Sequence, residues 1–420
     1  MKGLKRNLFG ILILCVPLLL QGAEFEVKVI KSTADLPEPF NTLWREGDVL
    51  VSDGKNLIIF GGTDRILKSY YKYPIEHTLG SVLGYVPKGK GFKSDLVIGS
   101  PYIRIKNKSQ YMGYSSFSAT PQKDEDGSLQ FHAVAHYKGN KGEKAEVKTL
   151  YHLNPESGEI DITSTVKNTG TVKLEDFHYS LYCSSGQVYS FSPSSGKSRL
   201  PFWVYPKKGH YLGWIDLTSI RSSYQSVSMN LDPGKSFEAR YVLLVDVKAE
   251  DLLKKIYQIL GVRTTKVKID TADFHGELME VVIQDMSSRV YFSSFFEKPQ
   301  PLVVMLPPGH YSIRAHFFPA VVENLLSVEV EKVNTCLLQA PAKGKVKVSI
   351  RNKAGAFVPG KTTFIGLDPT RTPYFKPQSP LETNNSHEYF KNSCFPLSEG
   401  LEVDLPVGTY VISASRGPEY

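Results

Sequence analysis

Apolar and polar residues alternate along most of this chain, which is the pattern of β-strands that bury one face and expose the other. Between Glu24 and Asp246 the alternating runs are separated by turn-forming residues, and none has the spacing of an amphipathic helix. The clearest pair, Lys144–Leu153 and Ile160–Val166, flanks the turn sequence NPESG and predicts a β-hairpin. We therefore expect residues 24–246 to form one large antiparallel β-sandwich.

One segment, from Asp246 to Gly261, breaks this pattern. Its apolar residues recur at the spacing of one helix face, at Leu252, Leu253, Ile256, Ile259 and Leu260. Asp246 is suited to cap the start of a helix, and Gly261 is suited to end it. We expect a connector helix over residues 247–262 that packs against the end of the first domain.

Two later stretches repeat one pattern. Residues 301–317 (PLVVMLPPGHYSIRAHF) and 400–415 (GLEVDLPVGTYVISAS) each contain an alternating run, the motif Leu-Pro-x-Gly-x-Tyr and a second alternating run. Proline and glycine favour a tight turn, so each stretch predicts a hairpin. We expect two small β-sandwiches of the seven-stranded type, at residues 263–341 and 342–420, which makes the whole chain all-β.

The N-terminus has the pattern of a signal peptide. A basic start at residues 2–6 precedes an apolar run from Leu8 to Leu20 and small residues at Gly22 and Ala23. The apolar run is short for a membrane span. We therefore expect residues 1–23 to be removed on export, which places the mature chain in the periplasm or outside the cell with no stable membrane span.

The charge of the chain narrows the classes of partner that it can bind. The formal net charge is +8, but lysine and arginine are scattered and no nucleic-acid-binding module accompanies them. This favours an anionic polymer or an envelope surface over nucleic acid as the partner.

Three cysteines remain after export, Cys183, Cys336 and Cys394, and they do not have the spacing of a disulfide framework or of a metal site. Either Cys336 bridges Cys394, or the cysteines are buried as small apolar residues.

Three family resemblances follow from these motifs. Residues 150–170 (LYHLNPESGEIDITSTVKNTG) and 231–245 (LDPGKSFEARYVLLV) resemble the galactose-mutarotase-type supersandwich of aldose epimerases and of non-catalytic parts of carbohydrate-active enzymes. The two later units resemble transthyretin-like, carboxypeptidase-regulatory domains, in which the Leu-Pro-x-Gly-x-Tyr segment is characteristic. Together the resemblances imply a large supersandwich, a connector helix and two small sandwiches.

The last unit is also similar to the accessory N-terminal region of CehA/McbA-family metallohydrolases. The likeness rests on residues 345–368 (KVKVSIRNKAGAFVPGKTTFIGLD), on Pro373–Phe375 and on the final SRGPEY. In that family a metal-binding PHP domain follows, and its D-x-H-x-H motif does not occur in these 420 residues. The resemblance implies a non-catalytic accessory region, either a fragment or a stand-alone relative, with a metallohydrolase domain as a covalently following or separate partner.

The histidines do not predict a metal site. His132 and His136 share one strand face, but a spacing of four residues separates them by about 13 Å, too far for one ion. Asp273 and His275 form a two-residue pair on one strand face, which by itself does not make a metal site. We therefore expect no bound metal and no cofactor.

Sugar epimerisation is an alternative function, and it requires a general acid and a general base on opposite sides of the sugar. The candidates are His132, His136, Glu175 and His178. The resemblance places the base glutamate late in the domain, yet no glutamate occurs between Glu175 and Glu238. We therefore expect no catalysis.

Carbohydrate binding without catalysis has its own candidate segment, at residues 202–211. Aromatic faces stack on sugars and basic groups bind carboxylates or sulfates. The segment offers Phe202, Trp203, Tyr205, Lys207, His210 and Tyr211. The same aromatic residues would also suit a sandwich core. The sequence thus predicts an exported binding module for a carbohydrate or anionic polymer, with a mutarotase-like epimerase or a structural envelope module as alternatives.

Overall fold

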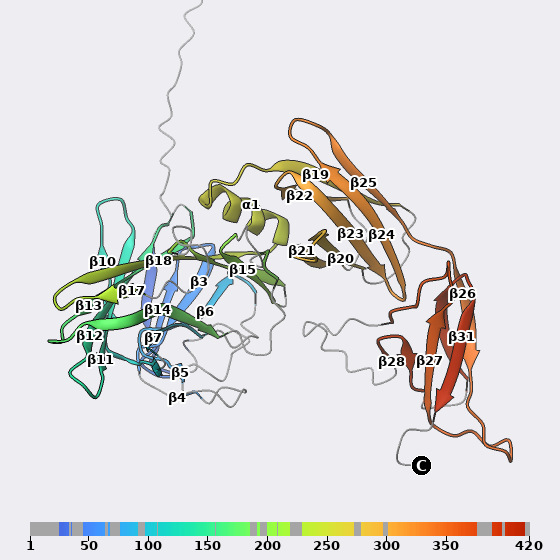
Figure 1. The fold of residues 1–420 in the computed structure, drawn as a ribbon, viewed down its shortest axis with the longest axis horizontal. Helices are drawn as coiled ribbons and strands as arrows, with labels where there is room; N and C mark the ends of the chain where they lie inside the picture. Colours follow the sequence, from blue (N-terminus) through green and yellow to red (C-terminus); the bar gives the residue numbers. More distant parts are fainter. Residues whose placement is uncertain are drawn as a thin grey trace, which may run out of the picture.

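The computed structural model is almost entirely β-structure, and one α-helix occurs among the residues that it describes (Figure 1). This confirms the predicted all-β class. The predicted signal peptide at residues 1–23, Asp273 and His275 lie outside the described residues. The structure describes residues 25–32, 35, 45–63, 66–67, 76–90, 97–106, 108–155, 157–184, 191–193, 200–207, 209–218, 229–272, 279–296, 301–375, 389–396 and 400–415.

The first domain consists of two eight-stranded antiparallel sheets. The first sheet has the order β1-β2-β3-β6-β7-β14-β17, with β8 beside β7. Its strands are β1 (Glu26–Val29), β2 (Val49–Ser52), β3 (Asn56–Phe60), β6 (Val82–Pro87), β7 (Val97–Ile105), β8 (Lys108–Tyr111), β14 (Leu174–Ser184) and β17 (Met229–Leu231). A separate two-stranded sheet joins β4 (Ile66–Leu67) to β5 (Glu76–His77).

The second sheet has the order β10-β11-β12-β13-β18-β16-β15, with β9 beside β11. Its strands are β9 (Tyr114–Phe117), β10 (Gln122–Lys123), β11 (Leu129–Lys138), β12 (Lys144–Leu153), β13 (Ile160–Asn168), β15 (Phe202–Lys207), β16 (His210–Asp216) and β18 (Ser236–Asp246). The pairing of β12 with β13 confirms the predicted hairpin, in the register Leu153 opposite Ile160.

The two sheets pack face to face around one core. Along β11, Phe131 and Ala133 point inward and are buried, while His132 and His136 alternate with them and are exposed. Phe131 stacks on Phe60 from the other sheet, with the ring centroids 4.7 Å apart. The strand alternation read from the sequence therefore corresponds to the two sides of this sandwich.

The helix α1 (Ala249–Ile259) begins three residues after the predicted capping residue. Its N-cap is Lys248, and no side chain caps it. Asp246 is the last residue of β18, and its carboxylate instead accepts a hydrogen bond of 2.9 Å from the Lys255 ammonium. The predicted cap was wrong because the strand continues to Asp246. Gly261, with φ of +63°, follows the helix in the left-handed conformation that suits glycine.

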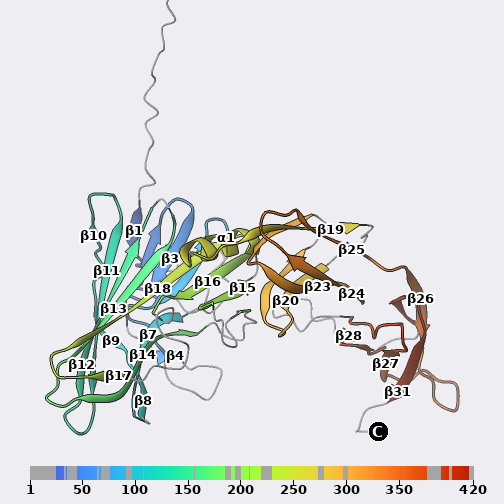
Figure 2. The same cartoon turned by 45° about the horizontal axis from the view of Figure 1, so that its top comes forward.

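The buried face of α1 belongs to a core that extends beyond the first domain. Leu252, Leu253 and Ile256 are fully buried, and they pack in one cluster with Leu244 of β18 and Val304 of the next sandwich. Figure 2 shows α1 lying between the large sandwich and the strands that follow. The helix thus joins the large sandwich to the middle sandwich through packing contacts as well as through the covalent chain.

The middle sandwich has seven strands, in sheets of order β22-β19-β25 and β21-β20-β23-β24. They are β19 (Thr265–Ala272), β20 (Met279–Asp285), β21 (Val290–Phe296), β22 (Leu302–Leu306), β23 (Gly309–Phe317), β24 (Ala320–Val328) and β25 (Asn334–Gln339). The last sandwich has six strands among the described residues, in sheets of order β26-β30 and β28-β29-β27-β31. They are β26 (Lys343–Val348), β27 (Lys361–Gly366), β28 (Tyr389–Phe390), β29 (Ser393–Cys394), β30 (Leu401–Pro406) and β31 (Tyr410–Ser415).

The two Leu-Pro-x-Gly-x-Tyr segments join strands as predicted, but they do not form hairpins. In the first copy β22 pairs with β19, whereas β23 pairs with β20 and β24 in the other sheet. In the second copy β30 pairs with β26, and β31 pairs with β27. In both copies the tyrosine hydroxyl donates to the carbonyl of the motif's first proline, from Tyr311 to Pro307 at 2.8 Å and from Tyr410 to Pro406 at 2.7 Å. The motif therefore carries the chain from one sheet to the other.

Two of the three cysteines are described with their side chains. Cys336 in β25 and Cys394 in β29 are both free and buried, so they do not bridge one another in this structure. Burial raises the pKa of the Cys394 thiol to about 11. The structure therefore favours the second alternative, in which Cys336 and Cys394 are buried as small apolar residues. The side chain of Cys183 lies outside the described residues. No helix in the described part of the chain is long and apolar enough to cross a membrane.

Candidate functional site

The four residues considered for acid and base catalysis lie on opposite sides of the large sandwich. His132 and His136 are exposed on the outer face of β11. Glu175 and His178 belong to β14 in the other sheet, where the neighbouring Phe177 points into the core. Because both sheets bury their inner faces against one another, their outer faces point away from each other. The structure therefore does not assemble an acid and a base from these two pairs.

Glu175 is an ion-paired surface residue. Its carboxylate lies 2.7 Å from the Lys106 ammonium, and both side chains are more than half exposed. The hydrogen bond from Lys106 lowers the pKa of Glu175, so the carboxylate stays charged at neutral pH. A carboxylate held in this state is a poor general acid.

His178, by contrast, lies in a cluster of aromatic and basic side chains. Tyr102 and Arg104 on β7 alternate with the buried Ile103, so both point outward, and His178 is directly opposite Arg104 in the strand register. The His178 ring meets the edge of Tyr102 at a centroid distance of 6.2 Å, and Tyr102 lies 4.9 Å from Tyr111 of β8. We call Tyr102, Arg104, Tyr111 and His178 the outer aromatic face.

Two members of the outer aromatic face are well placed to form hydrogen bonds with a ligand. Burial, with the nearby Arg104 charge, lowers the pKa of His178, so its imidazole is neutral at pH 7 and has one donor and one acceptor nitrogen. The Nε group of Arg104 is buried and has no hydrogen-bond partner among the described residues. Buried polar groups are normally satisfied, so this donor is suited to an anionic group.

The segment predicted to bind carbohydrate forms β15 and β16, and part of it is inaccessible. Phe202 is fully buried and meets the Tyr257 ring of α1 edge to face at 5.7 Å. Lys207 and His210 are 5% and 2% exposed. Strand alternation leaves no solvent face here, because the large sandwich core covers one side of these strands and the α1 core covers the other.

The other three aromatic residues of this segment are partly buried. Trp203 and Tyr205 pack against the core between the two large sheets. Tyr211 hydrogen-bonds through its hydroxyl to Ser294 of β21 at 2.6 Å, which ties the first domain to the middle sandwich. Their role in ligand binding stays a prediction.

A metal site among the described residues would be built from histidine, cysteine, aspartate and glutamate side chains. In that part of the chain no three histidine, cysteine, aspartate or glutamate side chains lie close enough to share an ion.

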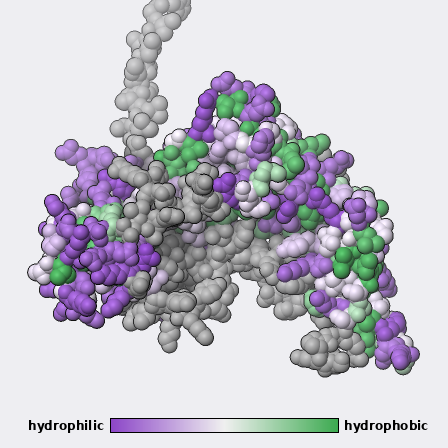
Figure 3. All heavy atoms as spheres, in the orientation of Figure 1, coloured by the Kyte–Doolittle hydropathy of each residue, from purple (hydrophilic) through white to green (hydrophobic). Residues whose placement is uncertain are grey.

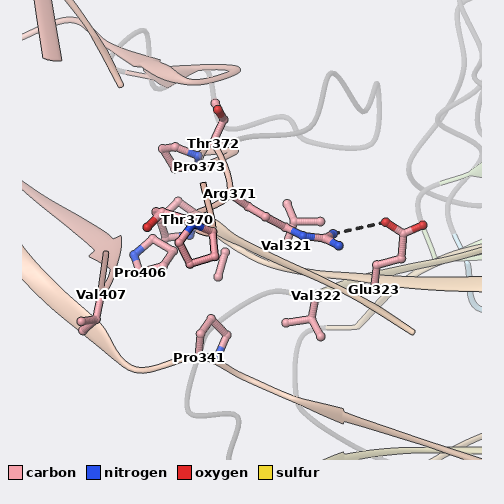
Figure 4. A pocket seen from close by; sticks show the side chains of 13 residues that line it. Val321, Val322, Glu323, Pro341, Thr370, Arg371, Thr372, Pro373, Pro406 and Val407 are labelled. Atoms are coloured by element: carbon pink, nitrogen blue, oxygen red, sulfur yellow. Dashed lines mark hydrogen bonds and ion pairs between the residues drawn. The ribbon is translucent and has the colours of Figure 1, made fainter. Parts of the chain in front are cut away.

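A hollow of about 310 Å³ lies where the middle and last sandwiches meet (Figure 4). Figure 4 shows Arg371 extending to Glu323, 3.2 Å away, while Glu323 also accepts a hydrogen bond of 2.5 Å from the Ser312 hydroxyl. These bonds lower the pKa of Glu323 and occupy both carboxylate oxygens. Five of the lining residues are prolines, which have no backbone donor: Pro319, Pro341, Pro369, Pro373 and Pro406.

Contacts beside this hollow show that it lies in the interface between the middle and last sandwiches, which we call the seam. The Tyr374 amide donates to the Pro319 carbonyl at 2.7 Å, and the Lys343 ammonium donates to the Phe318 carbonyl at 2.9 Å. His316 meets the Tyr374 ring edge to face at 5.5 Å. With its polar groups already paired, the hollow is better suited to joining two sandwiches than to holding a ligand.

His316 should make the fold sensitive to acid. Burial, with the Arg314 charge, lowers its pKa from 6.5 to about 4, and its Nδ1 has no hydrogen-bond partner among the described residues. The unfolded chain therefore binds a proton near pH 6.5 that the folded chain takes up only near pH 4, so stability falls as the pH is lowered through this window. We expect a loss of about 2 kcal/mol, discounted for partial exposure. Urea denaturation at pH 7 and pH 4.5 measures it.

The control for this effect is His316→Phe, which keeps an aromatic ring in the seam. The variant should lose less stability than the natural chain between these two pH values, by about the same 2 kcal/mol. An identical pH dependence in both proteins would show that His316 is not responsible.

Comparisons with known proteins do not assign a family. No family model matches the chain, and no curated protein matches it. Among solved structures, a polysaccharide lyase is 10% identical, with a TM-score of 0.27, covering 69% of this chain and 47% of its own. An alpha-N-acetylgalactosaminidase from Bifidobacterium bifidum is 13% identical, with a TM-score of 0.26, covering 50% of this chain and 39% of its own. The Bacillus anthracis TIE protein is 10% identical, with a TM-score of 0.16, covering 93% and 69%.

Two of the three neighbours are carbohydrate-active enzymes, and the chain spans less than half the length of each. All three TM-scores lie below 0.5, so none carries an argument about function. The CehA/McbA resemblance and the metallohydrolase partner stay predictions.

Proposed function

We propose that this protein is an exported, non-catalytic module that binds an acidic glycan on the outer aromatic face. The observation that carries the proposal is the position of the Arg104 Nε donor, which has no hydrogen-bond partner among the described residues, beside two tyrosine rings and a neutral His178. All four side chains point outward from neighbouring strands of one sheet. Such a surface combines a stacking platform with donors for an anion.

The tyrosine pair supports the stacking part of the proposal. The Tyr102 hydroxyl forms a hydrogen bond of 2.8 Å with the Ser109 hydroxyl of β8, and the Tyr102 and Tyr111 rings are tilted by 54°. These contacts hold the rings before a ligand arrives, which lowers the entropy cost of binding. A sugar ring presents apolar C–H groups that stack on such faces.

Arg104 supports the proposal that the bound glycan is acidic. A guanidinium binds a carboxylate or sulfate through paired N–H donors, and the bond is stronger where water is excluded. The formal net charge of +8 also attracts a polyanion over longer distances. A uronic-acid or sulfated glycan meets these conditions better than a neutral glycan.

The geometry favours binding over epimerisation. Catalysis needs an acid and a base around one sugar, and His132 with His136 lies on the face opposite to Glu175 with His178. A structural envelope module remains the second candidate function; it would need no donor such as the Arg104 Nε, which is buried and has no hydrogen-bond partner among the described residues.

The test is binding of the exported chain to polygalacturonate and to a neutral galactan, measured by isothermal titration calorimetry. We expect the acidic polymer to bind more tightly, and we expect Tyr102→Ala to weaken binding at least tenfold through loss of stacking. Arg104→Gln should remove the preference for the acidic polymer, and added salt should weaken binding.

His132→Ala serves as the matched control, because His132 is exposed on the outer face of the other sheet. It should bind as the natural chain does. Equal affinity for both polymers, or undiminished binding by Tyr102→Ala, would overturn the proposal.

A further inference from the structure

His178 and Arg104 lie side by side on the outer aromatic face. They belong to β14 and β7, which run antiparallel, and the strand register places them directly opposite one another. Ile103, which precedes Arg104, is buried. Phe177, which precedes His178, is buried as well, so both basic side chains point away from the core. Residues opposite one another in a sheet have their Cβ atoms about 4.5–5.5 Å apart. Two basic groups therefore share one small area of the surface.

Two charged side chains act on the His178 ring. Burial is the largest cause of its lowered pKa, and the Arg104 charge lowers it further, whereas the Asp176 charge raises it. Lys106, which follows β7, and Glu175 of β14 pair with one another at 2.7 Å. On the other side of β14, the described strand β17 has no charged residue. The free ring is therefore neutral at pH 7, because it is partly buried beside a fixed positive charge.

An anionic sugar group bound at Arg104 would lie beside His178 as well. A neutral imidazole presents one N–H donor, and the lone pair on its other nitrogen repels an anion. An imidazolium presents two donors and a positive charge, and an opposite charge within about 4–6 Å raises the pKa of a histidine. The anion also offsets the Arg104 charge that opposes protonation. The complex should therefore hold a proton that the free protein does not.

We propose that the outer aromatic face takes up one proton when it binds an acidic glycan, at the ring nitrogen of His178 that carries no hydrogen in the free protein. This inference rests on the proposed function and adds the way in which pH controls it. The proton comes from solvent, and the resulting imidazolium donates to the anion, while no covalent bond of the glycan breaks. The protein should therefore hold an acidic glycan more tightly in mildly acidic surroundings.

Two protonation equilibria of His178, in the free protein and in the complex, set the pH range of this effect. Because burial beside Arg104 lowers it, the pKa of free His178 lies below the ordinary value of 6.5, and binding raises it. Above both pKa values neither state holds the proton, and below both values both states do. Between them the affinity rises as the pH falls, by up to about tenfold per pH unit.

General electrostatic attraction to a polyanion also strengthens in acid, independently of this site. The chain has 10 histidines, and His132 and His136 are exposed on the outer face of the other sheet. Figure 3 shows hydrophilic residues over much of the large sandwich, at the left of the view. Protonation of exposed histidines raises the net charge, which attracts a polyanion to any side of the molecule. That contribution does not depend on His178, and salt screens it.

The test measures binding of a sulfated galactan to the exported chain by isothermal titration calorimetry at pH 7.5 and pH 5. Sulfate esters stay charged over this range, so the protein alone titrates. We expect about tenfold tighter binding at pH 5, which corresponds to a pKa raised by about one unit in the complex. Titrations in buffers of different ionisation enthalpy count the protons taken up. His178→Gln, whose side chain cannot take up a proton, should lose this gain.

His132→Gln is the matched control, because it removes a titrating group from the opposite face and should keep the gain. In an NMR titration, the midpoint of the His178 ring signals should rise when the galactan is present. A gain that His178→Gln retains, or no gain in the natural chain, would overturn the proton uptake and leave glycan binding in place. Absence of binding at both pH values would overturn the proposed function, and this inference with it.

Discussion

Replacing Ile256 with alanine is expected to destabilise the protein by about 3 kcal/mol, because the deletion leaves a cavity in a fully packed core. Ile256 is fully buried at the centre of the face that α1 presents. It also lies against Gly213 of β16, where its Cδ1 would be 3.1 Å from an added Cβ. Neighbouring side chains cannot collapse into the space easily, since strands pack on both sides of the helix.

Because Ile256 lies in a core that two sandwiches share, we also expect its replacement to destabilise both of them. The α1 core includes Val242 and Leu244 of the large sandwich as well as Val281 and Val304 of the middle one. The variant should therefore lower the denaturation midpoint of both bodies together. Urea denaturation followed by tryptophan fluorescence reports the first body, since Trp203 and Trp214 lie there, and circular dichroism reports both.

Lys254→Ala is the control, because Lys254 is exposed on the opposite side of the same helix. It should change stability by less than about 0.5 kcal/mol. A loss below about 1 kcal/mol for Ile256→Ala, or a shift confined to one of the two probes, would show that α1 is a linker rather than a shared part of the core.

Strands and the helix were predictable because their signals are local. The period of two along Lys144–Leu153 and Ile160–Val166, with a turn between them, specifies a hairpin without reference to the rest of the chain. The same holds for α1, whose apolar residues follow a helical period. The exact start of the helix was missed because Asp246 has the chemistry of a cap but is held in β18.

Sheet partners were not predictable, because they depend on residues far apart in the sequence. An alternating run before and after Leu-Pro-x-Gly-x-Tyr is compatible with a hairpin and with a crossing between sheets. The crossing is determined by the pairing of β22 with β19 and of β23 with β20. No local pattern contains that information.

The candidate site was missed for a similar reason. Of the outer aromatic face, the sequence singled out His178 alone. Tyr102 and Arg104 do show the outward period of a strand, but their register with His178 arises from the pairing of β7 with β14, more than seventy residues apart in the sequence. Conversely, Phe202 and His210 have the residue types of a binding site, yet packing on both sides of their strands buries them.

Asn168→Ala should destabilise the large sandwich by about 3 kcal/mol, because it breaks a buried polar network. The Asn168 side chain is fully buried at the end of β13. Its amide donates to the carbonyls of Val172 at 2.9 Å and of Leu231 at 2.8 Å, and its carbonyl oxygen accepts from the Gly170 amide at 3.0 Å. Alanine would remove the donor to the Val172 and Leu231 carbonyls, and the Gly170 amide would keep only its bond of 3.2 Å to the Lys144 carbonyl.

The network joins the turn after β13 to β17, so Asn168 links the two sheets of the large sandwich across one end. Asn230→Ala is the comparison, since Asn230 is exposed and accepts one hydrogen bond of 3.3 Å from the Asp176 amide. Urea denaturation should show a loss below about 1 kcal/mol for Asn230→Ala. If both variants lost the same stability, the buried amide would contribute no more than a surface one. A larger loss for Asn168→Ala would show that this turn is held by its side chain.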